Sequence, residues 1–413
     1  MNFDNLKDAL YWVETQAQFR PKTDLSKINQ ALNLSKLNLS KIRKIHVGGT
    51  NGKGSVCAYL SYILMEAGYR VGTFTSPYLV VFNERIRVDM TNINDDDLLN
   101  LIDEVYQFNQ KFFAIYNESL SFFELITIMS LIHFERSNVD AIIMEVGLGG
   151  LLDTTNALEY DLSLITNIGF DHMKQLGYTL MSIADNKLGI VKKNAHLITT
   201  VAPDLVDHFQ NHVKDVGATM EWINDDQIEL LKSLPLVFSL DGEVYQSNLL
   251  GDYQMKNASL AIRAIKYFDP SISIEKVKTG LLKTKWSARM EKIDPNLNIY
   301  LDGAHNEHAI KGLINNLDLM FPKQKRLVIF SALADKDIEK MLSMIEPHFE
   351  HVYLTAFADF RFQPLDKFVN AKRSYHPNAL ELYNNLKTKL DHDTVLIVTG
   401  SLHFVGYMYK QIK

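Results

Sequence analysis

The stretch His46-Val-Gly-Gly-Thr-Asn-Gly-Lys-Gly-Ser55 joins a short β-branched run to a helical pattern. Apolar residues between Val56 and Leu64 recur on one helical face, and Gly68 is a stop signal. Glycines allow successive backbone N–H groups to point at phosphate oxygens, the helix N-terminus adds partial positive charge, and Lys53 supplies a full charge. The stretch therefore predicts a loop that binds the phosphates of ATP through Gly49, Thr50, Asn51, Gly52, Lys53, Gly54 and Ser55.

This loop departs from the general phosphate-loop pattern, because its first glycine is displaced and Gly54 separates Lys53 from Ser55. An ordinary glycine turn at a strand-to-helix junction is the alternative. The Gly-Lys pair between a strand and a helix favours the phosphate loop.

Outward from the loop, β-branched runs alternate with helical patterns, which is typical of parallel α/β sheets. A turn signal at Asp294-Pro295-Asn296 separates two such series. We expect an α/β protein with an ATP-binding phosphate-loop domain at residues 1–288, in which helices flank a mostly parallel sheet, and a smaller Rossmann-like domain at residues 289–413. The expected strands are Lys44 to Val47, Val71 to Thr75, Asp140 to Val146, Leu162 to Ile168 and His196 to Thr200, followed by Ile299 to Leu301, Arg326 to Phe330, His351 to Thr355 and Thr394 to Val398.

Polar residues follow several of these strands, at the ends where open α/β sheets bind ligands. Glu145 ends an apolar run, and a carboxylate there is costly to bury unless something compensates its charge. Mg²⁺ takes oxygen ligands and bridges ATP phosphates, so Ser76 and Glu145 are candidate magnesium ligands. An ion pair with Lys or Arg is the alternative for Glu145. Taken singly, His172 and Lys187 are as readily explained as surface residues.

Composition limits the classes of partner. The net charge of −6 and pI of about 6.1 give no basic surface of the kind that a nucleic-acid-binding protein needs. A single cysteine, Cys57, excludes an internal disulfide and fits a reducing compartment. Because no signal peptide and no membrane-spanning apolar run is found, we expect a cytoplasmic protein without membrane contact.

Together these segments resemble the folylpolyglutamate synthase and dihydrofolate synthase family, within the group that includes the Mur ligases. The resemblance covers nearly the whole chain in the expected order. Its motifs are His46 to Ser55, Phe74-Thr-Ser-Pro77, Phe82-Asn-Glu-Arg-Ile86, Glu145-Val-Gly-Leu-Gly-Gly150, Asp153-Thr-Thr-Asn156, Asp171-His172, Leu176-Gly177, Ile183-Ala184, Leu301-Asp-Gly-Ala-His-Asn306, Asp335-Lys-Asp337 and Val398-Thr-Gly-Ser-Leu402.

The resemblance implies an ATP-dependent ligase that adds L-glutamate to a folate, to dihydropteroate or to both, through an acyl phosphate. It implies a monomer whose partners are these small molecules. The loop Ser76 to Arg87 is similar to a mobile loop near the folate. By the same resemblance, two Mg²⁺ ions are bound by Ser76, Glu145 and His172, and Lys187 is carbamylated. ATP is contacted by Gln254, Asn257, Arg289 and Asp302, and folate or glutamate is contacted by Asp153, His305 and Ser401. The catalytic residues that the resemblance implies are Lys53, Lys187, His172, Asp302 and His305.

Four positions depart from the family pattern. Leu151 stands where arginine is usual, Asn186 where glutamate is usual, Tyr253 where histidine is usual and Glu307 where proline is usual. These departures leave open a divergent relative that acts on another acid or only binds its ligands. A phosphate-loop ATPase that works as a switch is a separate alternative of a different class.

Overall fold

The computed structural model describes residues 3–17, 23–334, 336–359 and 361–412 of the 413-residue chain, so Asp335 of the predicted motif lies outside the described residues. Contacts within the chain divide it into two compact units. Unit 1 comprises Met1–Ile168, His172–Asp225 and Asn257–Lys283, and unit 2 comprises Gly169–Asp171, Asp226–Lys256 and Thr284–Lys413. A boundary between independently folding domains at residues 288 and 289 remains a prediction.

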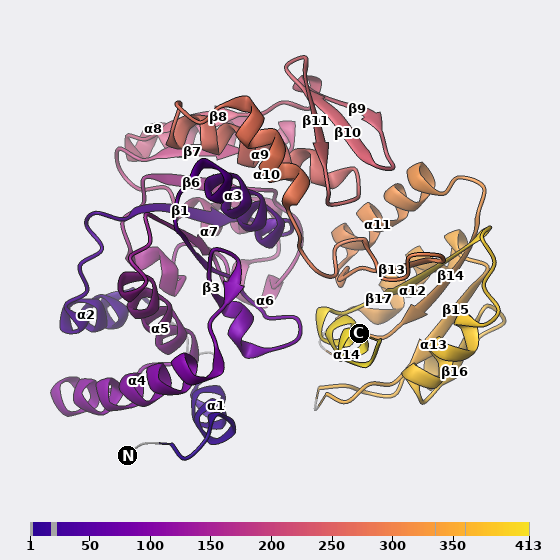
Figure 1. Ribbon diagram of the computed structural model, residues 1–413, viewed down its shortest axis with the longest axis horizontal. Coiled ribbons are helices and arrows are strands. Elements are labelled where there is room, and N and C mark those ends of the chain that lie inside the picture. The colour runs from indigo at the N-terminus through magenta and orange to yellow at the C-terminus, as the bar shows by residue number, and fades with distance from the viewer. Residues whose placement is uncertain (1–2, 18–22, 335, 360, 413) are drawn as a thin grey trace. The chain divides into compact units, whose positions relative to one another are not determined.

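Unit 1 is built on a sheet with the strand order β4-β3-β2-β5-β1-β6-β7-β8 (Figure 1). The strands from β2 to β8 in this order run parallel, and β3 and β4 are antiparallel additions. All five strands expected in this part of the sequence are present. The bounds are β1 (Arg43–Gly48), β2 (Val71–Phe74), β3 (Ile86–Val88), β4 (Thr91–Asn92), β5 (Ala141–Glu145), β6 (Leu162–Ile165), β7 (His196–Thr199) and β8 (Thr219–Trp222).

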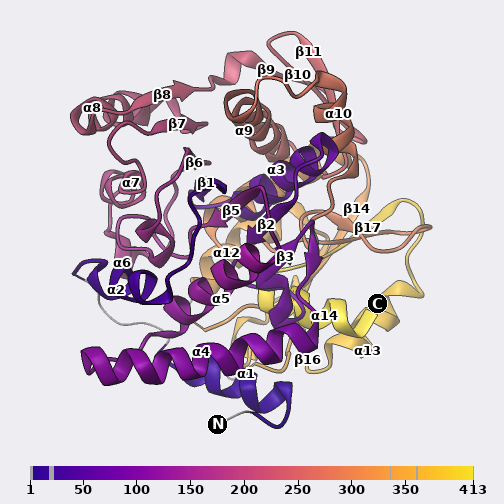
Figure 2. The same cartoon turned by 60° about the vertical axis from the view of Figure 1, so that its left-hand side comes forward.

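Helices cover both faces of this sheet (Figure 2). Ile142 and Met144 of β5 belong to one apolar core with α1, α2, α4 and α5, whereas α3 packs on β1, β2 and β5 and against α10. An ideal Cβ at Gly280 would lie 2.6 Å from Ile63 Cα, so glycine permits the close approach of α10 to α3. The helices of unit 1 are α1 (Leu6–Thr15), α2 (Ser26–Ser35), α3 (Lys53–Ala67), α4 (Asp95–Tyr116), α5 (Phe122–Arg136), α6 (Met173–Leu176), α7 (Leu180–Leu188), α8 (Val206–Val216) and α10 (Ile274–Lys283). The helix α9 (Tyr253–Phe268) starts in unit 2 and belongs to unit 1 from Asn257 onward.

Local signals explain where these helices begin and end. The Asn94 side chain accepts a hydrogen bond from Asp97 N at 2.8 Å at the start of α4. The acidic residues in the first turn of α4 interact favourably with the positive end of the helix dipole. Gly68 ends α3 with φ 95°, as the sequence predicted. At α7 the Thr179 hydroxyl caps the first turn by accepting from Ser182 N at 3.1 Å, and Gly189 is the C-cap.

Unit 2 contains a second sheet, with the order β12-β13-β17-β14-β15-β16, which is parallel except for β12. The four strands expected here are present, and α11, α12, α13 and α14 flank them. The sequence analysis missed several strands, because short or edge strands carry weak apolar patterns. These are the three-stranded antiparallel sheet β11-β10-β9, the edge strands β12 and β16, and the strands β3, β4 and β8 of unit 1. The bounds are β9 (Ile228–Lys232), β10 (Leu236–Leu240), β11 (Glu243–Ser247), β12 (Glu291–Lys292), β13 (Asn298–Leu301), β14 (Lys325–Phe330), β15 (His351–Thr355), β16 (Arg373–His376), β17 (Thr394–Thr399), α11 (Glu307–Met320), α12 (Ile338–Ile345), α13 (Ala379–Lys387) and α14 (Leu402–Ile412).

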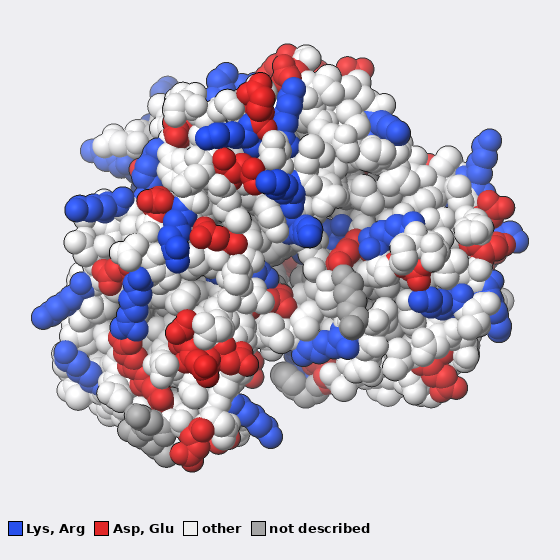
Figure 3. Space-filling view, viewed as in Figure 1, with Lys and Arg blue, Asp and Glu red and all other residues white. Residues whose placement is uncertain are grey.

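Among the described residues, no helix is long and apolar enough to cross a membrane. Basic and acidic side chains are interspersed over the face drawn in Figure 3.

Candidate active site

The phosphate loop connects the end of β1 to the start of α3. Gly52 is the N-cap of α3 with φ 88°, and it offers no side chain to satisfy the first N–H groups of the helix. An ideal Cβ at Gly52 would lie 2.4 Å from Asn257 Oδ1, so a larger residue would meet both strain and collision. This helix N-terminus, which has no side-chain cap, is therefore suited to an anion such as a phosphate group.

Two lysines converge on the backbone of this loop. Lys53 Nζ donates to Gly49 O and Thr50 O, both at 3.2 Å, and the buried Lys187 donates to Gly49 O at 2.9 Å. Lys187 lies near the end of α7, 138 residues from Gly49, so their proximity arises only from the tertiary structure. The structure thus brings together two of the predicted catalytic residues.

Thr166 and Asn167, which the sequence analysis missed, hold the same loop in place. Asn167 Oδ1 accepts from Asn51 N at 3.0 Å, and Asn167 Nδ2 donates to Asn51 O at 3.0 Å. Thr166 Oγ1 donates to the same carbonyl at 2.6 Å. The strand expected to reach Ile168 ends at Ile165, although the backbone contacts continue beyond it: Thr166 N donates to Gly48 O at 3.0 Å, and Thr50 N donates to Asn167 O at 2.9 Å. Two polar residues directly after a buried strand were the available signal.

Glu145 ends β5, beside the strand that leads into the phosphate loop, with Val47 and Glu145 in register. Its carboxylate is buried and accepts from the backbone N of Ser76 at 3.0 Å. Among the described residues, no cluster of three or more His, Cys, Asp or Glu side chains has metal-binding geometry. A buried carboxylate that accepts from the backbone of a serine nevertheless fits a hard divalent cation whose remaining ligands are phosphate and water oxygens. His172 is exposed and forms the N-cap of α6 with φ 48°.

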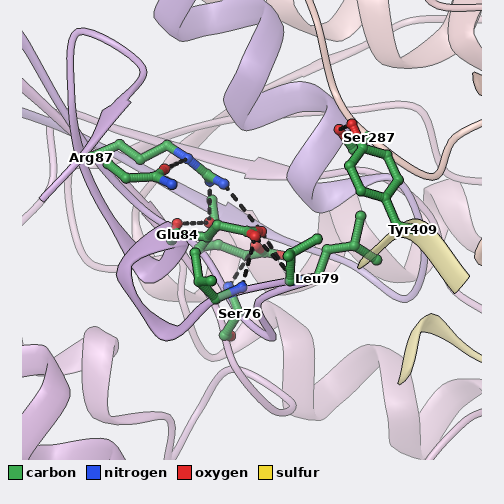
Figure 4. A network of polar contacts seen from close by, with 11 residues as sticks. Ser76, Leu79, Glu84, Arg87, Ser287 and Tyr409 are labelled. Atoms are coloured by element: carbon green, nitrogen blue, oxygen red, sulfur yellow. Dashed lines mark hydrogen bonds and ion pairs between the residues drawn. The ribbon is translucent and has the colours of Figure 1, made fainter. Parts of the chain in front are cut away.

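The loop from Ser76 to Arg87 is organised around one carboxylate, that of Glu84 (Figure 4). Leu79 N donates to Glu84 Oε2 at 3.0 Å, and Val80 N and Val81 N donate to Oε1 at 2.8 and 3.0 Å. Arg87 pairs with Oε2 at 3.4 Å and donates to Thr75 Oγ1 at 3.1 Å. The loop therefore has an internal scaffold of its own.

Asp153, predicted to contact the folate, forms hydrogen bonds with four donors of the protein. Its Oδ2 accepts from Gly147 N and Leu148 N at 3.1 and 2.9 Å, and its Oδ1 accepts from the backbone N and hydroxyl of Thr155 at 2.9 and 2.6 Å. Asp153 is buried and is the N-cap of the 3₁₀ helix Thr154–Ala157. Contact with the folate stays a prediction.

In unit 2, Asp302 follows β13 and is buried. Its Oδ1 accepts from Ala304 N at 2.9 Å, and its Oδ2 accepts from Met290 N at 2.9 Å and from the Tyr253 hydroxyl at 3.2 Å. Desolvation raises the pKa of Asp302 above its ordinary value, and the positive charge of Arg289 opposes that shift. Tyr253, which replaces the usual histidine, thus supplies a hydrogen bond to this carboxylate.

His305 lies in a second polar group of unit 2. Its Nδ1 is 2.8 Å from Gly303 O, which can only accept, so Nδ1 carries a proton. Burial lowers the pKa of His305 to about 4, so the ring is neutral near pH 7. Asp171 Oδ2 is 3.9 Å from His305 Nε2 and accepts from Asn306 Nδ2 at 3.0 Å, and Lys336 Nζ lies 3.5 Å from Asp171 Oδ1. Asp171 therefore groups with unit 2, whereas its neighbour His172 groups with unit 1.

The remaining predicted residues are buried polar side chains. Ser401 precedes α14, and its Oγ accepts from His403 N at 3.2 Å. Gln254 and Asn257 lie one helical turn apart in the first part of α9. Asn257 contacts the phosphate loop of unit 1 at Gly52, while Gln254 belongs to unit 2.

Comparison with known proteins agrees with this architecture. The sequence profile of the Mur ligase middle domain matches residues 47–265, and that of the Mur ligase glutamate ligase domain matches residues 288–402. The chain is similar to the dihydrofolate synthase/folylpolyglutamate synthase of Bacillus subtilis, with 31% identity over 430 aligned residues that cover 100% of both chains. It is also similar to the folylpolyglutamate synthase of Lacticaseibacillus casei, with 34% identity over 88% of both chains.

Solved structures show the same fold. The folylpolyglutamate synthase of Thermotoga maritima superposes with a TM-score of 0.85 at 27% identity, covering 98% of this chain and 96% of the other. The bifunctional folylpolyglutamate synthase/dihydrofolate synthase of Yersinia pestis, complexed with AMPPNP and Mn ion, gives a TM-score of 0.87 at 25% identity over 99% of this chain and 98% of the other. The sequence, fold and site geometry together establish that the chain belongs to the folylpolyglutamate synthase/dihydrofolate synthase family, a branch of the Mur ligases.

Proposed function

We propose that this protein uses ATP to join L-glutamate to a folate, or to dihydropteroate, through an acyl-phosphate intermediate. The observation that supports this most strongly is the phosphate loop, in which an uncapped helix N-terminus, Gly52 with positive φ and Lys53 meet beside Glu145. Relatives with 31% and 34% identity carry the names of these two synthases. A structure of a related bifunctional synthase contains Mn, AMPPNP and L-glutamate.

The first step activates the acid. A carboxylate resists attack by an amine, because its negative charge repels the nucleophile and oxide is a poor leaving group. In the proposed reaction a carboxylate oxygen of the folate or pteroate attacks the γ-phosphorus of ATP, the bond to the β-phosphate oxygen breaks, and ADP leaves. Lys53 and the N–H groups at the start of α3 stabilise the negative charge of the transferring group, and Arg289 is the proposed second cation.

Ser76 and Glu145 would hold the magnesium ion, which supplies charge neutralisation at the ATP phosphates. The donor set fits a hard cation, because Glu145 is a buried carboxylate with a neighbouring hydroxyl residue. The Thr166–Asn167 pair and Lys187 hold the loop backbone before the nucleotide binds. A second ion at His172 is part of the proposal, as are ATP contacts from Gln254, Asn257 and Asp302.

In the second step the neutral amine of glutamate attacks the acyl carbon, the bond between that carbon and the phosphate oxygen breaks, and inorganic phosphate leaves with the amine proton. His305 and Ser401 are the proposed glutamate contacts. Because Nδ1 of His305 donates to Gly303 O, its Nε2 presents a lone pair that can accept a hydrogen bond from the glutamate amine. With a pKa of about 4, His305 is too weak a base to hold the amine proton at neutral pH, so its role is to orient the amine.

Carbamylation of Lys187 is a separate part of the proposal. A neutral amine adds carbon dioxide and loses one proton, which leaves one N–H on Nζ and a carbamate group whose two oxygens share one negative charge. The remaining N–H could keep the hydrogen bond to Gly49 O. Intact-mass measurement under carbon dioxide should show the mass of one bound CO₂, which Lys187→Met removes. If the protein has the same mass, with no bound CO₂, in the presence and in the absence of carbon dioxide, the modification is rejected.

The function is tested by measuring product formation with ATP, L-glutamate and each acceptor in turn. Lys53→Ala should abolish glutamate addition without unfolding the protein, because the loop loses its full positive charge. Lys283→Ala, which removes an exposed lysine that pairs with Glu66 at 2.7 Å, is the matched control and should retain activity. Glutamate addition by Lys53→Ala would contradict the assignment. Steady ATP hydrolysis without glutamate or folate would instead indicate an ATPase switch.

A further inference from the structure

His46, on β1, lies in the sheet three residues before the phosphate loop begins at Gly49, and the proposed mechanism gives it no role. Its side chain is completely buried. The Nε2 atom is 2.7 Å from Thr155 Oγ1, and the ring stacks on Tyr160 with centroids 4.1 Å apart and an interplanar angle of 9°. Tyr160 donates its hydroxyl proton to Thr155 O at 2.7 Å. Both rings therefore converge on Thr155.

The direction of the hydrogen bonds follows from the donor inventory. Asp153 Oδ1 accepts from Thr155 Oγ1 at 2.6 Å, and a carboxylate can only accept, so the single hydroxyl proton of Thr155 points to Asp153. The Thr155 oxygen must then accept from His46, which places a proton on Nε2. In the described part of the chain Nδ1 of His46 has no hydrogen-bond partner, as expected for the atom without a proton.

The far end of this chain of contacts is the backbone that follows Glu145. The other oxygen of Asp153 accepts from Gly147 N and Leu148 N. An ideal Cβ at Gly147 would lie 2.4 Å from the Phe123 ring, so the backbone is confined from the other side as well. The position of these two peptide groups therefore depends on where the Asp153 carboxylate is held.

We propose that His46 is a positioning residue: as the neutral Nε2–H tautomer it orients the Thr155 hydroxyl toward Asp153, which fixes the Gly147–Leu148 backbone and with it the end of β5 that carries Glu145. The inference rests on the proposed function only for the use made of Glu145. Burial lowers the pKa of His46 to about 3, which keeps the ring neutral over the working pH range. This arrangement assigns Asp153 a structural task and gives the buried histidine a hydrogen-bonding role.

The first test uses the unaltered protein. Side-chain ¹⁵N chemical shifts of histidine-labelled protein distinguish the two neutral tautomers and the charged ring. We expect His46 to be the Nε2–H tautomer between about pH 6 and pH 8. A proton on Nδ1, or a charged ring in this range, would overturn the proposal. This result does not depend on whether the enzyme is active.

The second test compares two variants of one residue. Thr155→Val removes the hydroxyl with little change of shape, and Thr155→Ser keeps it. Hydrogen exchange at the amides of Gly147 and Leu148 should become about tenfold faster in Thr155→Val than in the unaltered protein, and should stay close to it in Thr155→Ser. Amides of β7 in the same sheet are the internal reference. Equal exchange at Gly147 and Leu148 in all three proteins would refute this relay, that is, the hydrogen-bond chain from His46 through Thr155 to Asp153.

The third test links the relay to Glu145. Mn²⁺ binding to the AMPPNP complex, measured by electron paramagnetic resonance, should be about tenfold weaker in Thr155→Val, as for other residues that orient a metal ligand. AMPPNP binding without metal should not change. A lower unfolding temperature with unaltered Mn²⁺ affinity would mean that the relay only stabilises the fold. If the unaltered protein bound neither AMPPNP nor Mn²⁺, the proposed function would fail, while the tautomer and exchange results would still decide the relay. Should Thr155→Val not fold, the tautomer measurement decides alone.

Discussion

Replacing Asn167 by alanine should weaken nucleotide binding although Asn167 is not expected to touch the nucleotide. The side-chain amide forms two hydrogen bonds with Asn51, one to its N and one to its O, both at 3.0 Å. A typical hydrogen bond contributes about 1 kcal/mol net, so the pair contributes at most about 2 kcal/mol to ordering of the loop. Both residues are half-buried, and water can replace part of this, which leaves about 1 to 2 kcal/mol.

In Asn167→Ala, part of the free energy of nucleotide binding is used to order the loop, which in the unaltered protein is already ordered before the nucleotide binds. Because 1.4 kcal/mol corresponds to a factor of ten, we expect AMPPNP to bind Asn167→Ala about five- to thirtyfold more weakly. Titration calorimetry measures this directly. The backbone contact from Thr50 N to Asn167 O at 2.9 Å survives the substitution, so the fold should be retained.

The matched control is Asn248→Ala, which removes a comparable side-chain hydrogen bond, from Nδ2 to Thr284 O at 2.9 Å, in unit 2. It should leave AMPPNP affinity unchanged. If Asn167→Ala binds AMPPNP within twofold of the unaltered protein, the claim that this amide orders the loop is wrong.

Three further predictions concern pH, packing and metal. Tyr253→Phe removes a hydrogen bond that favours the charged form of Asp302, so the pKa of Asp302 rises further above its ordinary value. The stability that this raised pKa contributes is complete at low pH and is lost as the pH rises through the pKa. Denaturant unfolding should therefore show the variant about 1 kcal/mol less stable than the parent at pH 7 but nearly equal to it near pH 4. A uniform loss at both pH values would refute this. Gly280→Val should lower the unfolding free energy by roughly 2 kcal/mol, because its side chain would collide with Ile63, while AMPPNP affinity of the folded protein stays unchanged; a variant as stable as the parent would count against the packing argument. Chelation of divalent cations should stop glutamate addition without changing the unfolding temperature of the nucleotide-free protein, and continued product formation in excess chelator would exclude a metal requirement.

The features that the sequence predicted correctly are those that depend only on residues close together along the chain. The alternation of apolar runs indicated nine strands, all of which are present, and the glycine-rich stretch between β1 and α3 indicated the uncapped helix that fits phosphate. Linear motifs were sufficient to identify the family, because their order along the chain is independent of how the segments pack.

Only the tertiary structure decided which distant segments meet. Asn167 and Lys187 reach the phosphate loop from 116 and 138 residues away, and Thr155 meets His46 across 109 residues. These contacts depend on the strand order, in which β1 lies between β5 and β6, so that loops far apart in sequence follow neighbouring strands. Local periodicity fixes which face of a strand is apolar but contains no information about its neighbours. The direction of each buried proton is likewise a property of the assembled network.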